Sequence, residues 1–327
     1  MTVRFALTTD QAALRDAARD LLATHCPPGT VREAWDGKPA DGLWRRLADL
    51  GLTGAAVPEE LGGLGLSDVE MAAVLVEVGY AAVPLPVAET AAVAAPLLAA
   101  AGDPGGHLAG VLGGATRVAL AGRTRLVPYG GRAELVLDLA GPGLAALADL
   151  PAEPVPAIDG SRALVRLAEA PGGAFEVDAG ALALARDRAA LAVAAQLVGL
   201  GRRMLDLTVA YVRERHQFGV PVGGFQAVKH RLADATLEVE FAEPAVLQAA
   251  WAAATGAPTR ARDVSTAYVL AAEAAAGAAR AAIQCHGAMG YTVEYDLHLY
   301  AKRAWALAAD GDGVDAHLAR VADAIGV

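Results

Sequence analysis

Cysteine, serine and aromatic residues are scarce in this chain of 327 residues, and each scarcity argues against a class of protein. The two cysteines, Cys26 and Cys285, lie far apart and form no Cys-x-x-Cys or Cys/His pattern, so neither a disulfide framework nor a zinc site is expected. None of the three serines lies in Gly-x-Ser-x-Gly, which argues against a hydrolase. Aromatic residues make up 5% while alanine is plentiful, and this favours helix packing over a β-sandwich.

Positive charge and long hydrophobic runs are also lacking. The net charge of -10 argues against a nucleic-acid partner. The longest apolar run, Ala91–Ala101, is too short to span a bilayer, so no membrane partner is expected. The first residues, MTVRFALTTDQAALRD, show no secretory leader pattern, which predicts a cytoplasmic protein. Residues 310–317 begin like a calcium loop but lack its ligand spacing, and no metal site is expected.

The chain reads as three blocks of different character. Residues 1–110 show helical periodicity, with Thr9 as the expected N-cap of a helix over Asp10–Thr24. Ser67 and Glu70 form the pattern Ser-x-x-Glu, a capping box ahead of a second apolar helix.

The second block, residues 111–176, has short Val/Leu-rich runs separated by Gly and Pro, which predict a small β domain. The third block, residues 177–327, returns to long helical patterns. Its expected helices cover Ala181–Arg215, Phe225–Thr255 and Thr259–His286. Long helices with short connections predict a C-terminal four-helix bundle. The expected fold class is therefore mostly α with a small β domain.

Two segments of the third block carry a specific pattern. Residues 213–235 read RERHQFGVPVGGFQAVKHRLADA, and residues 282–304 read AIQCHGAMGYTVEYDLHLYAKRA. Both resemble signature segments of the acyl-CoA dehydrogenase family, in which Ala288 stands where a second Gly is usual. Residues 50–79 are similar to the N-terminal helical domain of that family. The resemblance implies an N-terminal helical domain, a reduced middle β domain and a C-terminal four-helix bundle.

The resemblance also implies that the chain binds FAD through its helical domain, at a site shared with a neighbouring subunit. An arginine can hold a pyrophosphate with a bidentate fork, amide side chains can bond polar cofactor edges, and glycine permits close backbone approach. The residues that match the family motifs at such positions are Arg215, Gln217, Phe218, Gln226, Gln284 and Gly287.

The catalytic base of the family is missing from both of its known places. The reaction removes an α-proton from an acyl thioester, which needs a carboxylate in a dry pocket. Most members carry a Glu about 20 residues after the Gly-x-Gly-aromatic turn, and counting from Tyr291 lands on Gly311. Asp310 and Asp312 flank that position and are the only catalytic candidates. The minority position falls on Ala189.

The middle block departs from the family as well. The family's Thr-Glu-Pro loop, which supports the flavin and the thioester, is absent from the matching stretch RVALAGRTRLVP of this chain. These losses resemble the subunit without a catalytic base in actinobacterial heteromeric α2β2 acyl-CoA dehydrogenases, which act on steroid side chains. The implied partners are a homologous subunit with the catalytic Glu, an acyl-CoA thioester and an acceptor such as electron-transfer flavoprotein.

Three functions follow from these observations as alternatives. The first is a subunit that helps to bind FAD in a heteromeric enzyme introducing an α,β double bond into an acyl thioester. The second is a self-sufficient FAD-dependent dehydrogenase of acyl-CoA or acyl-carrier protein, and the third is a non-redox structural protein on the same fold.

Overall fold

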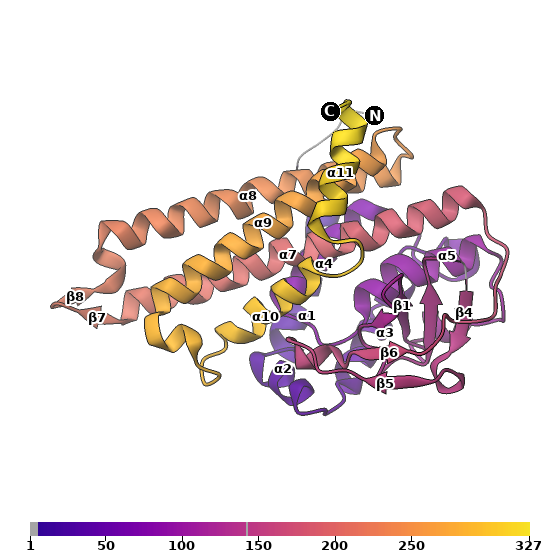
Figure 1. Ribbon diagram of the computed structural model, residues 1–327, viewed down its shortest axis with the longest axis horizontal. Helices are drawn as coiled ribbons and strands as arrows, with labels where there is room; N and C mark the ends of the chain where they lie inside the picture. Colours follow the sequence, from indigo (N-terminus) through magenta and orange to yellow (C-terminus); the bar gives the residue numbers. More distant parts are fainter. Residues whose placement is uncertain (1–5, 142) are drawn as a thin grey trace.

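The computed structural model describes residues 6–141 and 143–327. Figure 1 shows helices at the N-terminal end of the chain, a small β portion beside them, and long helices that extend away from both. The expected fold class, mostly α with a small β portion, is confirmed. Where the three domains begin and end, at residues 1–110, 111–176 and 177–327, stays a prediction.

The N-terminal part is built from short helices around a buried one. Its helices are α1 (Thr9–His25), α2 (Pro28–Trp35), α3 (Asp41–Asp49), η1 (Leu52–Gly54), η2 (Glu59–Leu61), α4 (Asp68–Tyr80), η3 (Ala88–Ala94), α5 (Ala95–Ala100) and α6 (Leu108–Leu112). The capping box of α4 is confirmed, since Ser67 Oγ accepts from the backbone of Val69 at 3.2 Å. The expected cap of α1 was wrong by one residue, because Thr8 closes the capping box with Gln11.

The β portion consists of two short sheets. Their strands are β1 (Val118–Ala121), β2 (Leu126–Val127), β3 (Leu135–Asp138), β4 (Gly143–Ala146), β5 (Ala152–Pro154) and β6 (Val165–Leu167), with turns η4 (Leu147–Asp149) and η5 (Gly160–Arg162). One sheet has the order β1-β3-β4, in which β1 and β3 run parallel. The other has the order β2-β6-β5 and is antiparallel. Strands this short leave little room for a cofactor-binding barrel.

Three long helices dominate the C-terminal part and agree closely with the expected ones. They are α7 (Ala179–Glu214), α8 (Gln226–Ala254) and α9 (Arg260–His286), followed by η7 (Gly287–Tyr291), α10 (Leu297–Ala308) and α11 (Gly313–Ile325). Within the described residues, no helix is both long and apolar enough to cross a membrane.

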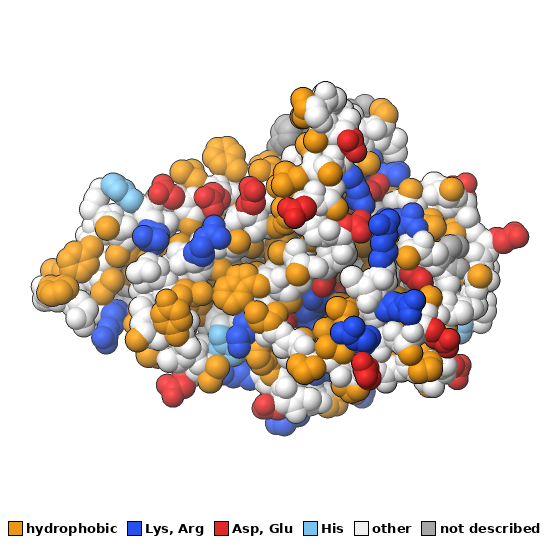
Figure 2. All heavy atoms as spheres, in the orientation of Figure 1, with side chains coloured by type: hydrophobic (Ala, Val, Ile, Leu, Met, Phe, Trp, Pro, Cys, Tyr) orange, Lys and Arg blue, Asp and Glu red, His pale blue; other side chains and the backbone are white. Residues whose placement is uncertain are grey.

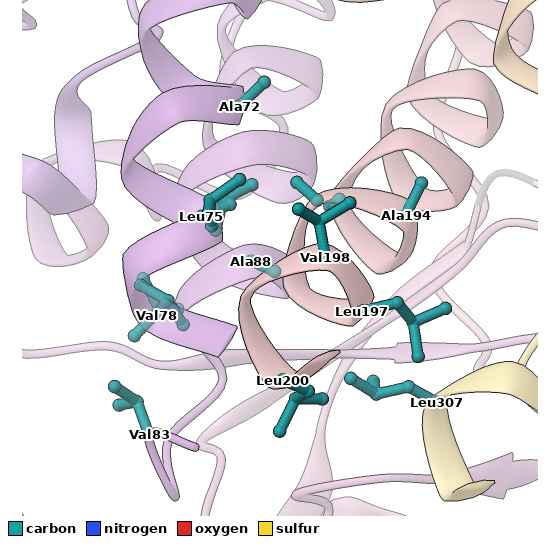
Figure 3. Close-up of a cluster of buried hydrophobic side chains, with 14 of the residues drawn as sticks. Ala72, Leu75, Val78, Val83, Ala88, Ala194, Leu197, Val198, Leu200 and Leu307 are labelled. Carbon is teal, nitrogen blue, oxygen red and sulfur yellow. The ribbon is translucent and has the colours of Figure 1, made fainter. Parts of the chain in front are cut away.

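Helices α4 and α7 cross with their backbones in near contact. A Cβ atom on Gly79 would lie 2.1 Å from the carbonyl oxygen of Gln196, and one on Gly199 would lie 1.9 Å from that of Val76. Side chains from both helices interlock around this crossing, with Leu75 and Val198 facing each other (Figure 3). This packing fixes the long helix α7 to the N-terminal part and so holds its C-terminal end in place.

Candidate functional site

The first signature segment forms a hairpin at the far end of α7. Strands β7 (His216–Gln217) and β8 (Val220–Pro221) pair antiparallel around Phe218 and Gly219. Both turn residues are left-handed, with φ of 55° and 82°, as a tight two-residue hairpin requires. The turn leaves the Phe218 side chain 92% exposed, and its ring forms a T-shaped pair with Phe225 at 6.2 Å between ring centroids.

The second signature segment begins at the same end of the molecule as this hairpin. The ring of Tyr211, near the end of α7, stacks on His286 at the end of α9, with 4.3 Å between centroids. Tyr295 closes the group at 4.8 Å from His286. Tyr211 lies just before the first segment and 75 positions before His286. The structure therefore brings the two segments to one end of the molecule, where α8 also begins (Figure 1).

The residues expected to bind the cofactor all lie at this end and point polar groups outward. Arg215, Gln217 and Gln284 have exposed side chains. Gln226 is also exposed, and its Nε2 atom lies 2.9 Å from Nε2 of His230. Gly287 adopts φ of 59° with open space where a side chain would be, so a ligand can approach its backbone.

Unpaired cations accumulate around these residues. Arg213, Arg215 and Lys229 have no carboxylate partner among the residues that the structure describes. In contrast, Arg202, which lies earlier on α7, forms an ion pair with Glu243 at 2.6 Å. Figure 2 shows Lys and Arg side chains at the end that carries β7 and β8, together with exposed hydrophobic side chains and with Asp and Glu side chains beside them. We call the surface around Arg213, Arg215 and Lys229 the cationic end.

Two grooves open at the same end. An apolar groove of about 350 Å³ lies between α7 and α8 and is bordered by Arg213 and Lys229. A second groove of about 420 Å³ lies between α8 and α9 and is lined by His230, Arg231 and Arg280, with two carboxylates. Exposed guanidinium groups, amides and a flat ring fit the anionic pyrophosphate and the adenine of FAD. This chain's helical end therefore suits part of such a cofactor.

The two aspartates expected near the position of the family base are both engaged in ion pairs. They lie in the loop between α10 and α11. Asp310 pairs with Arg162, whose side chain is 5% exposed, and Asp312 pairs with Arg320 at 2.6 Å. Each aspartate therefore already binds an arginine of the same chain, and neither is free of an ionic partner.

The minority base position also lacks an acid. Ala189 is half-buried on α7 and packs against the core. The nearby arginines serve other contacts, because Arg188 bonds Asp68 at 2.6 Å and Arg186 donates to the carbonyl oxygens of Leu139 and Ala140. These side chains tie α7 to the rest of the chain.

The sequence analysis did not identify one carboxylate, Glu89, which lies near the arginine that pairs with Asp310. Glu89 lies on η3 near Arg162, and burial raises its pKa to about 7. The signal that could have found it is its place as a lone acid within an apolar helical stretch. Its ionic neighbours come from segments more than 70 positions away, and no local pattern reveals them.

Comparisons with known proteins agree with the geometry of both regions. Residues 8–104 match the N-terminal domain of acyl-CoA dehydrogenases, and residues 179–321 match their C-terminal domain. The acyl-CoA dehydrogenase IpdE2 of Mycobacterium tuberculosis is 36% identical over 298 residues, covering 90% of this chain and 91% of the relative.

Solved structures give the same result. The chain superimposes on the ChsE4-ChsE5 complex from Mycobacterium tuberculosis with a TM-score of 0.86 at 25% identity, covering 99% of each chain. It superimposes on the Tcur3481-Tcur3483 steroid ACAD G363A variant with a TM-score of 0.83 at 28% identity, covering 97% of this chain and 98% of that one. The resemblance to the actinobacterial heteromeric type is confirmed.

Proposed function

This chain belongs to the acyl-CoA dehydrogenase family, and we propose that it acts there as a subunit that completes a flavin site on a homologous partner chain. The pair introduces an α,β double bond into an acyl-CoA thioester. The names of its solved relatives support this proposal, since both are two-protein assemblies and one is described as a steroid enzyme.

The observation that carries the proposal is a contrast within the chain. The cations at the end of α7 face outward with no carboxylate partner in the described part of the chain, whereas Asp310 and Asp312 are held in ion pairs. Charged groups without an ionic partner are available to a ligand, whereas groups already in ion pairs are not. The first set can hold the phosphates of a cofactor that sits largely on another subunit.

Bound FAD would supply the acceptor for the hydride that leaves the β-carbon of the thioester. Arg215 would hold the pyrophosphate with its guanidinium, and Gln226 and Gln284 would offer amide groups to the polar edges of the cofactor. Phe218 would cover a flat face of the cofactor and exclude water from it. The partner supplies the carboxylate that takes the α-proton, because neither family position in this chain does so.

The outer face of α8 supports assembly. Phe241 and Leu237 are 73% and 56% exposed, although both are large and apolar. Large contiguous apolar patches left in water mark interfaces, and this pair, four positions apart on one helix, contributes to such a patch. A homologous subunit packed on α8 would cover them and lie next to the cationic end.

Purification with and without a partner tests the proposal. The expected result is a colourless chain alone and a yellow complex when a homologous subunit with the catalytic Glu is present. A yellow homo-oligomer of this chain with dehydrogenase activity would support the self-sufficient alternative. A chain that stays colourless with every homologous subunit tested would support a structural role.

A further inference from the structure

The loop that joins η7 to α10, residues 292–296, lies within the second signature segment and buries few of its side chains. Val293 is 62% exposed, and so is most of Tyr291 just before the loop, at 79%. Glu294 is exposed as well, while Tyr295 packs against the core. A segment that buries so little apolar surface gains little from the hydrophobic effect. Its position therefore depends strongly on polar contacts.

Arg32, on α2 of the N-terminal part, supplies those contacts. Its Nε donates to a carboxylate oxygen of Asp296 at 2.8 Å, and Nη1 donates to the carbonyl oxygen of Val293 at 2.7 Å. Nη2 donates to the carbonyl oxygen of Glu294 at 3.1 Å and also lies 2.8 Å from the Asp296 carboxylate. Among the described residues, no other side chain of the N-terminal part donates to residues 292–296.

The helix that carries Arg32 is itself firmly placed. Val31 and Ala34 lie on its buried face, and Pro28 opens the helix at a position where the fixed φ of proline suits a first turn. The planar guanidinium binds its three acceptors in fixed directions, so it sets the orientation of the loop as well as its distance from α2. Residues 261–264 positions apart in the sequence are joined in this way.

The loop that Arg32 holds is connected to the residues expected at the flavin. Tyr295 lies between the residues that Arg32 binds, and its ring is 4.8 Å from that of His286 and 5.8 Å from that of Tyr211. The buried His286 immediately precedes Gly287, where the backbone is open to a ligand. Movement of the loop would carry Tyr295 away from His286 and remove the support behind Gly287.

We propose that Arg32 is a positioning residue for the flavin site, which holds the loop after η7 so that Tyr295 supports His286 and Gly287 presents its backbone to the cofactor. This inference rests on the proposed function, because it concerns the same surface. Arg32 acts through the loop and does not touch the cofactor. A lysine at this position keeps the charge, but its single nitrogen cannot reach all three acceptors in the same way. The guanidinium geometry, and not the charge alone, is therefore what the site requires.

Proteolysis of the chain without flavin tests the first step. Arg32 binds the carbonyl group that a glutamate-specific protease attacks after Glu294. In Arg32→Gln and Arg32→Lys, cleavage there should be faster by roughly threefold or more, because the loop opens more often. Cleavage after Glu60, an exposed residue of η2, should keep its rate, since the fold as a whole is unchanged. The matched control Arg46→Gln, on the exposed face of α3, should alter neither rate.

Titration of the assembled complex with FAD tests the second step. Both Arg32 variants should weaken FAD binding by about three- to tenfold, while Arg46→Gln leaves the affinity unchanged. Full affinity in Arg32→Lys together with weak binding in Arg32→Gln would show that charge suffices and would overturn the inference. Arg32→Lys also carries the test should Arg32→Gln fold poorly. Unchanged cleavage after Glu294 in both variants would overturn it as well.

Arg215→Ala in the same titration separates this inference from the proposed function. Weak binding in Arg215→Ala with full affinity in both Arg32 variants would overturn the positioning role and leave the proposed function standing. Full affinity in all three variants would contradict both. Weak binding in all three, with faster cleavage only after Glu294, is the result that we expect.

Discussion

The hairpin end of α7 and the loop between α10 and α11 differ in whether their charged side chains form ion pairs. At the hairpin end, Arg215 is exposed and has no carboxylate partner among the described residues. At the loop, Asp310 and Asp312 are neutralised by arginines of the same chain. A site that binds an external anion keeps its cations available, whereas a site that has lost its chemistry can turn its charges to internal contacts. This difference is the reason why we propose cofactor binding at one end and structural roles at the other.

The largest effect on stability is expected when a buried ion pair of the internally paired region is removed. Arg303→Met leaves Asp159 buried at 1% exposure with its ionic partner gone. Such a loss costs about 3–5 kcal/mol, which urea denaturation measures. Arg45→Met, on the exposed face of α3, should change stability by less than about 0.5 kcal/mol. Comparable losses in both variants would show that the Arg303 pair does not hold the fold.

The cationic end should respond through the cofactor. Arg215→Ala removes a charged donor from a phosphate, a contact worth roughly 1.5–3 kcal/mol, or about ten- to a hundredfold in affinity. Flavin fluorescence titration of the assembled complex measures the effect. Arg45→Ala is the matched control. Unchanged flavin affinity in Arg215→Ala would remove this residue from the site.

Acid should affect the loop region through His317. Burial, aided by Arg320, lowers the pKa of His317 to about 4, and the ring stacks on Tyr268 beneath the loop. The unfolded chain therefore binds more protons between roughly pH 4 and 6.5, so stability falls as the pH falls through that window, by on the order of 2 kcal/mol. Thermal unfolding across this range should show a flatter profile for His317→Gln. Parallel profiles would contradict the assignment.

The smallest effect, on turnover, is expected for the two aspartates that flank the family's base position. The double variant Asp310→Asn, Asp312→Asn should keep most of the turnover of the complex at saturating flavin, because neither residue is the base. A true base would lower turnover by about two to four orders of magnitude on removal. Near-complete loss of activity, with fold and flavin intact, would support the self-sufficient alternative.

Much of the fold could be predicted from the sequence because local residue patterns determine its helices. Helical periodicity and the Ser67 capping box predicted the helices, and the two signature segments predicted that Arg215 and Gln284 would serve one site. The ion pair between Arg162 and Asp310 was beyond such reasoning. The two residues are 148 positions apart, and no local pattern links them.

We propose that the cationic end of this chain, with Arg215, binds a flavin that is held mainly by the partner. Flavin affinity should be measured for two complexes, one with Arg215→Ala in this chain and one with the matching arginine of the partner replaced by Ala. We predict weaker binding, by about ten- to a hundredfold, only for the first complex. Weakening only in the second complex would place the flavin on the opposite pair of surfaces and contradict this proposal.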